Sequence, residues 1–488
     1  MGRHVIKNKI ELDLITDLDM LNMIEKMKRG GLCFVGSKRH VKANNKYLDD
    51  YDSNKPSNYL MYWDANNLYG WAMVQSLPYK NLKFIDNITI DQILETPDDS
   101  DIGFICEVDL EFPQELHDKF KDFPPCPEAM TPNIEWFSDF QKEVGTTNNV
   151  IRNGKYNGSD KLIPHLMKHE RYVIHYRNLK FIKSLGVKIT NLNKVISFDQ
   201  KEWLKPYIDF NTDKRKEAKN EFEKDFFKLM NNSVFGKTME NVKNRIELKL
   251  TTDNERAIKW FSKLEFKNSK FFDGLHMIEM FKKEIVYDKP IYVGTTILDL
   301  SKLCMMDFHY NVINKEFENK HNLIYSDTDS LVYSIENEDI YEWVKNNKSH
   351  FDLSDSIRPD MKDNTNEKVI GKMKDEFNGL LISEFIGLNP KAYSINHQTL
   401  NEAKELEIKN KKTLKGVSKV VVKNEISHND YINVLNNNEP IKRDVISIRS
   451  FDHQLFTHKA IGKVALTSFY DKFKMIDNNN NLPYGYRQ

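Results

Sequence analysis

The strongest constraint on this chain comes from two short apolar segments, far apart in the sequence, that each end at aspartate. Residues 59–63, of sequence YLMYW, run directly into Asp64, and residues 323–325 run into SDTDS at 326–330. Short runs of aromatic and aliphatic residues are typical of buried strands. The apolar character resumes at 331–334, so the second segment predicts a strand, an acidic turn and a returning strand. Pairing of these strands in one sheet would bring carboxylates from distant parts of the chain to one point.

Carboxylates gathered at one point suit Mg²⁺, which binds a few protein oxygens and completes its shell with substrate phosphates. Two such ions about 3.5–4 Å apart would activate an attacking 3′-hydroxyl and stabilise the leaving pyrophosphate. The alternative is ordinary turn chemistry, because Asp and Ser favour turns through local hydrogen bonds. Asp64 and the residues 326–330 alone leave both interpretations open.

A long charged segment between these strands, residues 212–230, contains neither proline nor glycine and predicts one continuous helix. Lys216, Lys224 and Lys228 would share one face of this helix and could line a phosphate-binding channel. On an isolated helix such a stripe is more often a solvated face. Here, however, the segment leads into NSVFG at 232–236, where a glycine permits close backbone approach and an aromatic ring offers a stacking face for a base.

In their order along the chain, these segments resemble the motifs of the family B DNA polymerases. DANNLYG at 64–70 is similar to motif A (DxxxLYP), KLMNNSVFG at 228–236 to motif B (KxxxNSxYG), and YSDTDS at 325–330 to motif C (YxDTDS). KAY at 391–393 matches the KxY element beyond motif C, and KMKDE at 372–376 also belongs to the similarity. The resemblance covers nearly the whole chain and is greatest to the protein-primed branch of viruses, linear plasmids and Polinton/Maverick-type transposons.

The resemblance implies a role for each matching position. Asp64 and Asp329 would bind two Mg²⁺ ions, which Mn²⁺ could replace, with the backbone carbonyl of Ala65 assisting. Asp327 would be a further catalytic carboxylate beside them, and the ring of Tyr69 would be a steric gate against the 2′-hydroxyl of a ribonucleotide. The resemblance also implies contact with the incoming nucleotide for Lys216, Lys224, Lys228, Asn232 and Phe235. Contact with the primer terminus is implied for Lys391 and Tyr393. Residues implied to support the motifs are Ser233, Gly236, Tyr325, Thr328 and Ser330.

The sequence also departs from the family pattern. Phe235 replaces the usual tyrosine, so the ring face remains while one hydroxyl hydrogen bond is lost, and Gly70 replaces proline, which makes the local backbone less rigid. The segment before Asp64 is too short for the 3′–5′ exonuclease domain that family members normally carry. We therefore expect either a fragment of a longer polymerase or an enzyme that does not proofread.

The resemblance implies a mixed α/β fold, in which palm, fingers and thumb build a right-hand polymerase. Prolines concentrated between 77 and 147 predict an inserted subdomain, in the position where protein-primed enzymes face the terminal protein. The expected domains are an N-terminal helix and the first palm part with motif A at 1–76, the insertion at 77–160, palm at 161–199, fingers with motif B at 200–241, palm with motif C and the KxY element at 242–395, and thumb with the C-terminal region at 396–488.

Hydrophobic periodicity predicts several further elements. Apolar residues recur near helical spacing at 12–27 and again at 162–185, so each segment predicts a helix. Residues 187–198 alternate and predict a pair of strands. A helix is also expected at 298–312.

Composition limits the class of protein without deciding it. The 72 basic and 72 acidic residues cancel, which argues against a purely electrostatic nucleic-acid binder but not against an enzyme that is polarised locally. Four scattered cysteines form no CxxC pair, and His165, His169 and His175 are expected to be surface or packing residues and not a metal site. No apolar run is long enough to span a bilayer, so a soluble intracellular protein without membrane contact is expected.

The expected reaction is template-directed DNA synthesis by a monomer, with template-primer DNA and deoxynucleoside triphosphates as partners and a terminal protein as a candidate primer. The resemblance implies replication of a virus-like or transposable element as the setting. Two alternatives stay open at this point: an inactive, truncated DNA-binding remnant of such a polymerase, and a metal-dependent nuclease that uses the same carboxylates. The nuclease would give Tyr69 and the residues 232–233 no task.

Overall fold

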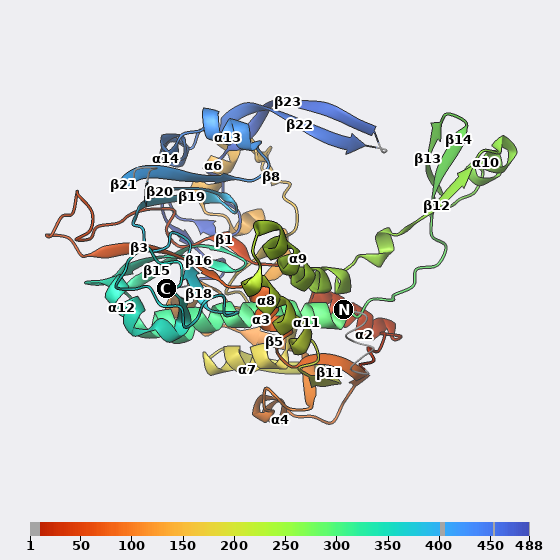
Figure 1. Cartoon of the computed structure of the whole chain (residues 1–488), viewed down its shortest axis with the longest axis horizontal. Helices are drawn as coiled ribbons and strands as arrows, with labels where there is room; N and C mark the ends of the chain where they lie inside the picture. Colours follow the sequence, from red (N-terminus) through yellow and green to blue (C-terminus); the bar gives the residue numbers. More distant parts are fainter. Residues whose placement is uncertain (1–9, 401–405, 452–453, 488) are drawn as a thin grey trace.

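The computed structural model describes residues 10–400, 406–451 and 454–487. Its centre is a ten-stranded sheet in which β1, β15, β16, β3, β19, β20 and β21 follow one another, with β2, β17 and β18 paired beside them (Figure 1). These strands are β1 (Cys33–Val35), β2 (His40–Lys42), β3 (Asn58–Ala65), β15 (His321–Asp327), β16 (Ser330–Glu336), β17 (Phe351–Asp352), β18 (Met373–Asp375), β19 (Ile382–Asn389), β20 (Ala392–Leu400) and β21 (Leu406–Leu414). Because β16 is antiparallel to both β15 and β3, the acidic ends of β15 and β3 lie at the same edge of the sheet, on either side of the start of β16.

The central strands are buried along almost their whole length, as their apolar sequences predicted. The hairpin expected from the apolar runs around motif C is formed by β15 and β16. The long helix α11 (Ile291–Asp307) is also almost wholly buried, and it contacts α3 (Leu68–Met73). α11 begins earlier than the predicted 298–312, because Pro290 precedes its first turn, where a missing N–H does no harm. After Asp307 the helix continues as a π-helical stretch, Phe308–Asn314.

A second sheet, in the order β10-β5-β11-β4, joins residues from both sides of position 160. Its strands are β4 (Leu77–Phe84), β5 (Ile102–Glu111), β10 (His169–His175) and β11 (Lys188–Lys201). The helix predicted at 162–185 is wrong over its first part, since β10 pairs with β5 and only α7 (Tyr176–Ser184) is helical. The aromatic and β-branched residues at 172–174 favour a strand once a partner strand is present. The strand pair predicted at 187–198 is wrong too, because β11 is one strand between β5 and β4.

The charged segment forms two helices, so the single helix predicted at 212–230 is wrong. α8 (Lys205–Glu217) ends before α9 (Glu221–Thr238) begins, and Asn220 between them has an extended backbone. The side chain of Asn220 accepts a hydrogen bond from the backbone N–H of Glu223 and thereby caps α9. Asparagine at such a position favours a helix start over helix continuation, because its side chain replaces a missing backbone partner.

The N-terminal helix α2 (Leu18–Lys26) is shorter than the predicted 12–27. Asp17 starts it by accepting a hydrogen bond from the N–H of Met20, with 2.8 Å between N and O. All four cysteines are free thiols. Further elements are α4 (Ile90–Glu95), α5 (His117–Phe120), β6 (Glu128–Met130), α6 (Asp139–Thr147), β7 (Ile151–Arg152), β8 (Lys155–Tyr156), β9 (Lys161–Ile163), α12 (Ile340–Asn346), β24 (Lys474–Met475) and β25 (Asn481–Leu482).

Two units project from the body of the molecule (Figure 1). One is a three-stranded sheet with a helix, joined to the body by two connecting segments, and the other is a long hairpin. The first consists of β12 (Ile246–Thr251), α10 (Asn254–Phe261), β13 (Phe266–Phe272) and β14 (Leu275–Phe281), and the second of β22 (Ile441–Phe451) and β23 (Gln454–Leu466), near the helices α13 (Lys419–Glu425) and α14 (His428–Asn437). Within the described part of the chain, every helix is too short or too polar to cross a membrane.

Candidate active site

Of the two aspartates predicted to bind metal, Asp64 lies on β3 and Asp329 lies in the turn that leads into the adjacent strand β16. Ser330 of β16 pairs with Asp64 of β3. The backbone N–H of Ala65 donates to the carbonyl of Asp329, with 2.7 Å between N and O. Since Asp329 immediately precedes Ser330, this register brings the motif A and motif C aspartates to the same end of the two strands.

The turn that carries Asp327 and Asp329 is shaped by contacts with the N-terminal segment. Thr328 has a φ of +63°, which is uncommon for threonine, and the N–H of Asp329 donates to the carbonyl of Asp327 at 2.7 Å. The N–H of Thr328 donates to the carbonyl of Leu32 at 2.8 Å. A Cβ on Gly31 would lie only 2.2 Å from Oγ1 of Thr328, so the close approach requires glycine. Residues just before β1 therefore hold this turn in place.

Burial and mutual repulsion disfavour the charged forms of the central carboxyls. Burial, followed by the charges of Asp329 and Glu376, raises the pKa of Asp64 to about 7. Burial, together with the charge of Asp327, also raises the pKa of Asp329. The ammonium group of Lys228 lowers both pKa values but does not offset the other effects. A cation bound by these carboxylates would remove the repulsion, so this donor set fits a divalent ion.

Asp327 differs from Asp64 and Asp329 because a lysine is paired directly with it. Nζ of Lys391 lies 2.6 Å from each carboxylate oxygen of Asp327. The backbone N–H of Lys391 donates to the hydroxyl of Tyr325 at 3.0 Å. Lys391 is thus tied to motif C at both its backbone and its side chain. Its contact with a primer terminus stays a prediction.

The predicted steric gate packs against the ring predicted to shape the base-pair pocket. The rings of Tyr69 and Phe235 stack with centroids 4.5 Å apart and planes inclined by 21°. Tyr69 lies in α3, where the side chain of Asn67 accepts a hydrogen bond from the N–H of Gly70 at 3.3 Å. A proline at position 70 would lack this N–H, and a Cβ there would lie 2.1 Å from Nδ2 of Asn67. The glycine that replaces the family's proline is therefore matched to the cap of α3.

The three predicted phosphate-binding lysines do not share one helix. Lys216 is exposed in the last turn of α8, whereas Lys224 and Lys228 lie on α9, so the predicted stripe on a single helix is wrong. Nζ of Lys224 pairs with Glu221 at 2.6 Å. Lys228 is the lysine of this set whose charge lowers the pKa values of both metal-binding aspartates. Its position therefore agrees with a contact to phosphates held at the centre.

The remaining residues of motifs B and C take supporting positions. On α9, Asn232 is half-buried, whereas Ser233 and Gly236 are exposed. The hydroxyl of Ser233 donates to a carbonyl of its own helix at 3.1 Å. Ser330 is buried, and its hydroxyl donates to the carbonyl of Asp327 at 3.4 Å, which adds a bond across the motif C turn.

Tyr393, predicted to hold the primer terminus, lies in the packing beneath motif C. It is 5% exposed, and its ring centroid lies 4.8 Å from that of Tyr325. Its hydroxyl is 3.3 Å from the hydroxyl of Tyr62. Tyr325 is itself fully buried, with its hydroxyl 3.4 Å from Sγ of Cys33. Contact between Tyr393 and a primer stays a prediction.

Two further charged residues near the centre were not assigned roles from the sequence. The charge of Glu376 raises the pKa of Asp64, and Nζ of Lys411 lies 2.9 Å from Oε1 of Glu376. Glu376 follows β18, which pairs with β3 at Asp64. The run KMKDE at 372–376, which resembles the family, is the sequence feature that could have indicated a position near Asp64. Lys411 lies on β21, which reaches the sheet by pairing with β20. Apolar periodicity does not reveal such a contact.

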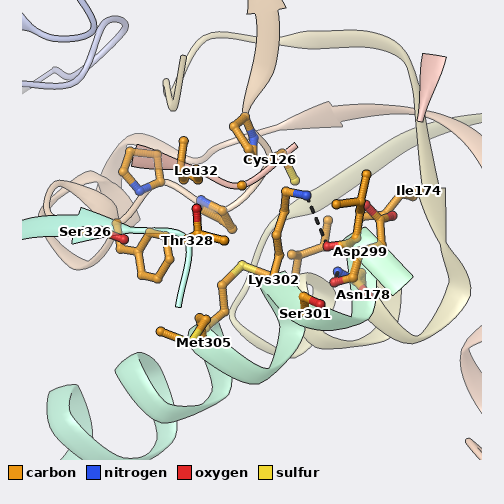
Figure 2. A pocket seen from close by; sticks show the side chains of 18 of the residues that line it. Leu32, Cys126, Ile174, Asn178, Asp299, Ser301, Lys302, Met305, Ser326 and Thr328 are labelled. Carbon is orange, nitrogen blue, oxygen red and sulfur yellow. Dashed lines mark hydrogen bonds between the residues drawn. The ribbon is translucent and has the colours of Figure 1, made fainter. Parts of the chain in front are cut away.

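A cavity of about 40 Å³ lies behind the motif C turn, between this turn and α11 (Figure 2). Thr328 and Leu32 line it on one side, and Asp299 and Lys302 of α11 line it on another. Nζ of Lys302 donates to the carbonyl of Arg29 at 2.7 Å, and burial lowers the pKa of Lys302 to about 8. The cavity has room for a few water molecules and not for a nucleotide, and Tyr69 is among the residues that line it.

Comparison with known proteins agrees with these motifs. A family model described as DNA polymerase type B, organellar and viral, matches residues 14–315. The solved structure of phi29 DNA polymerase in an orthorhombic crystal form aligns with a TM-score of 0.55 and 13% identity, over 94% of this chain and 65% of that chain. Its ternary complex with primer-template DNA and incoming nucleotide substrates aligns with a TM-score of 0.54 and 15% identity, over 94% of this chain and 64% of that chain. No sequence among curated proteins matches.

The likeness to phi29 DNA polymerase confirms the fold expected from the motifs, a mixed α/β right hand. Identities of 13% and 15% support the fold and not a particular activity. The chain spans just under two thirds of the length of the phi29 structures that it matches, 65% and 64%. The domain boundaries within the right hand stay predictions.

Proposed function

The chain belongs to the organellar and viral type B DNA polymerases, and on this basis we propose that it adds deoxynucleotides to a 3′-hydroxyl under the direction of a DNA template. The observation that carries the proposal is the meeting of Asp64 and Asp329 at one end of adjacent strands, with the ring of Tyr69 stacked on Phe235 nearby. Phosphoryl transfer depends mainly on positioning and on charge stabilisation. The aspartates supply the metal ligands for this, and the stacked rings supply a surface for nucleotide selection.

The family generally depends on divalent metal ions, and the carboxyls of this chain fit such ions. Asp64 and Asp329, with the backbone carbonyl of Ala65, would hold two Mg²⁺ ions, for which Mn²⁺ could substitute. When bound, these ions favour deprotonation of the 3′-hydroxyl and neutralise charge on the phosphates. Burial, followed by the charges of Asp329 and Glu376, raises the pKa of Asp64, and this supports the assignment because a bound cation stabilises the charged carboxylate. Asp327, paired with Lys391, would support the centre without being a ligand.

The residues around the aspartates have separate tasks in this proposal. Lys228 would hold the triphosphate, because its charge already acts on both aspartates. Lys216 on α8 and Lys224 on α9 would contribute positive charge from two different helices. The ring of Tyr69 would occupy the space of a 2′-hydroxyl, and Phe235 would support it from behind. Asn232 would complete the pocket for the nascent base pair, and Lys391 and Tyr393 would position the primer terminus.

Template-primer DNA and deoxynucleoside triphosphates are the partners that we propose. Solved structures of phi29 DNA polymerase contain primer-template DNA, incoming nucleotide substrates or single-stranded DNA. Initiation on the hydroxyl of a terminal protein, with residues 77–160 facing that protein, would fit the protein-primed branch. The proposed setting is replication of a virus-like or transposable element by a monomeric, intracellular enzyme.

Primer extension by the purified chain tests the proposal. We expect wild-type protein to extend a labelled primer on a DNA template with Mg²⁺ and deoxynucleotides, and Asp329→Asn to lose this synthesis. Asp118→Asn is the matched control, because Asp118 is exposed on α5 and its carboxylate accepts a hydrogen bond from Tyr486. Circular dichroism would check that all three proteins are folded. Equal synthesis by Asp329→Asn and wild type would refute the assignment.

A further inference from the structure

A second group of side chains with metal-ligand chemistry lies where β6, β9 and β10 come together. Glu128 on β6, His165 after β9 and His169 at the start of β10 each offer one donor atom, and these atoms lie within 4.8 Å of one another. Nε2 of His165 is 3.0 Å from Oε2 of Glu128, and Nε2 of His169 is 3.8 Å from the same oxygen. The sequence predicted surface or packing positions for these histidines and not a metal site, because Glu128 lies far from them along the chain.

The spacing of the donors fits a tetrahedral zinc ion. Zinc bonds to imidazole nitrogen and carboxylate oxygen are about 2.0–2.2 Å long, which places neighbouring ligands of a tetrahedron roughly 3.3 Å apart. The observed separations of 3.0 and 3.8 Å lie on either side of this value. Nε2 of His169 donates a hydrogen bond to the carbonyl oxygen of Cys126, 2.7 Å away, so a bound zinc ion would take the place of this proton. Two imidazoles and a carboxylate form a set that zinc binds readily.

The two imidazole rings also carry buried atoms that lack partners. His165 is 1% exposed and His169 is fully buried. Among the described residues, neither Nδ1 atom has a hydrogen-bond partner. The rings stack with centroids 4.2 Å apart and planes inclined by 8°, so their Nε2 atoms face the same carboxylate. Neutral imidazole is the form that binds a metal ion.

Protein contacts alone account for only part of this arrangement. A hydrogen bond to Glu128 satisfies His165, and one to the Cys126 carbonyl satisfies His169, but neither explains why the two rings converge on one carboxylate. The side chain of Glu128 is 27% exposed and gives an ion a path from solvent. Arg29 opposes a cation here, because its charge acts on both Glu128 and His169, so moderate affinity is expected.

We propose that Glu128, His165 and His169 bind one zinc ion that has a structural role. The ion would join β6 to β10 and so fix the ribbon of β6 and β9 against the second sheet. Cys126 belongs to the segment 123–127 that lines the cavity behind the motif C turn. Zinc binding would thereby stiffen one wall of that cavity. The inference is independent of the proposed polymerase activity, because it concerns a different set of ligands.

Zinc content and coordination test the proposal directly. The full chain, carrying Asp64→Asn and Asp329→Asn so that the aspartate centre does not bind zinc, is stripped with a chelator and titrated with ZnCl₂. We expect one equivalent bound per chain with moderate affinity and, after replacement by Co²⁺, the intense visible absorption of a tetrahedral site. Absence of a stoichiometric equivalent, or an octahedral Co²⁺ spectrum, would overturn the proposal.

Two variants separate ligand loss from general damage. Glu128→Gln keeps the side-chain shape and the capacity to bond His165, and we expect its zinc dissociation constant to rise roughly tenfold or more. His276→Gln is the control, since His276 lies on β14 and contacts Asn254. We expect it to bind zinc as the parent does. Zinc should raise the unfolding temperature of the parent and of His276→Gln, but not that of Glu128→Gln. Equal zinc affinity in all three proteins would contradict the proposed ligands.

Discussion

Replacing Asp64 by asparagine is expected to stabilise the metal-free fold while it abolishes DNA synthesis. Asp64 lies half-buried at the end of β3, where burial and the charges of Asp329 and Glu376 oppose its ionised form. Asparagine has nearly the same shape but carries no charge, so it removes this repulsion together with the metal ligand. Sites that bind cations commonly reduce the stability of the fold that holds them, and this variant measures the effect.

The magnitude follows from the pKa of Asp64. An unfolded aspartate has its ordinary pKa of 3.8, whereas the folded value is raised to about 7. A tenfold change in proton affinity is worth about 1.4 kcal/mol, so ionisation of Asp64 destabilises the fold by at most roughly 4 kcal/mol. Access of water reduces the effect, and we expect Asp64→Asn to gain about 2 kcal/mol at neutral to alkaline pH.

The sign of the pH dependence is part of this prediction. The folded carboxyl holds its proton more tightly than the unfolded one, so wild-type stability from this group falls as pH rises from 3.8 to about 7 and is constant above. Asp64→Asn should lack that fall. Glu240→Gln should instead be less stable than wild type above the ordinary glutamate pKa of 4.5. Hydrogen bonds from Arg245 and Lys237 lower the pKa of Glu240 to about 2, so the charged form of Glu240 stabilises the fold.

Urea unfolding in the presence of a chelator, at about pH 5 and about pH 8, measures these differences. Addition of Mg²⁺ at the higher pH should then stabilise the wild type and leave Asp64→Asn nearly unchanged, because only the former keeps both carboxylates. A variant that is less stable than wild type at about pH 8 without metal would refute the electrostatic reasoning. A wild type and a variant with the same pH dependence would refute it as well.

Three further changes probe the centre. Tyr69→Val removes the ring that stacks on α9 and should raise ribonucleotide incorporation relative to deoxyribonucleotide, measured as the ratio of kcat/KM values; an unchanged ratio excludes Tyr69 as the gate. Lys391→Met removes a charge that lowers the pKa of Asp329, so the acid limb of the pH–rate profile should move to higher pH, and a profile that does not move contradicts this role. Gly31→Val places a Cβ 2.2 Å from the motif C turn and should lose about 1–3 kcal/mol of stability together with synthesis. Gly30→Val is its control, because a Cβ there meets nothing within 4 Å, and equal thermal unfolding shifts in the two variants would contradict the steric argument.

The meeting of the motif A and motif C aspartates could be predicted because it depends on short, strongly apolar strands. Residues 59–63 and 323–325 are apolar throughout, and each run ends at the acidic residues that matter. The order of the motifs then indicated which strands belong together. Contacts that depend on pairing between distant segments could not be predicted from the sequence. The ion pair between Lys411 and Glu376 is an example.

The wrong element predictions have two different physical causes. The break between α8 and α9 is local, because the Asn220 side chain caps the second helix, and a closer reading of capping residues could have found it. The strand at 169–175 is a tertiary effect, since its helical spacing is overridden by pairing with β5. The ion pair of Lys391 with Asp327 is tertiary as well, because β20 and the motif C turn are brought together only in the folded sheet.

Because β16 is held between β15 and β3, the candidate centre should tolerate changes of side chain far better than changes of length. One residue inserted in β3 before Asp64 would shift its register against β16 and turn the following side chains to opposite faces of the sheet. The projecting units have no such restriction, since the segments that join them to the body can change length without moving Asp64 relative to Asp329. Insertions and deletions are therefore expected to accumulate in the projecting units, whereas the central hairpin changes by substitution alone.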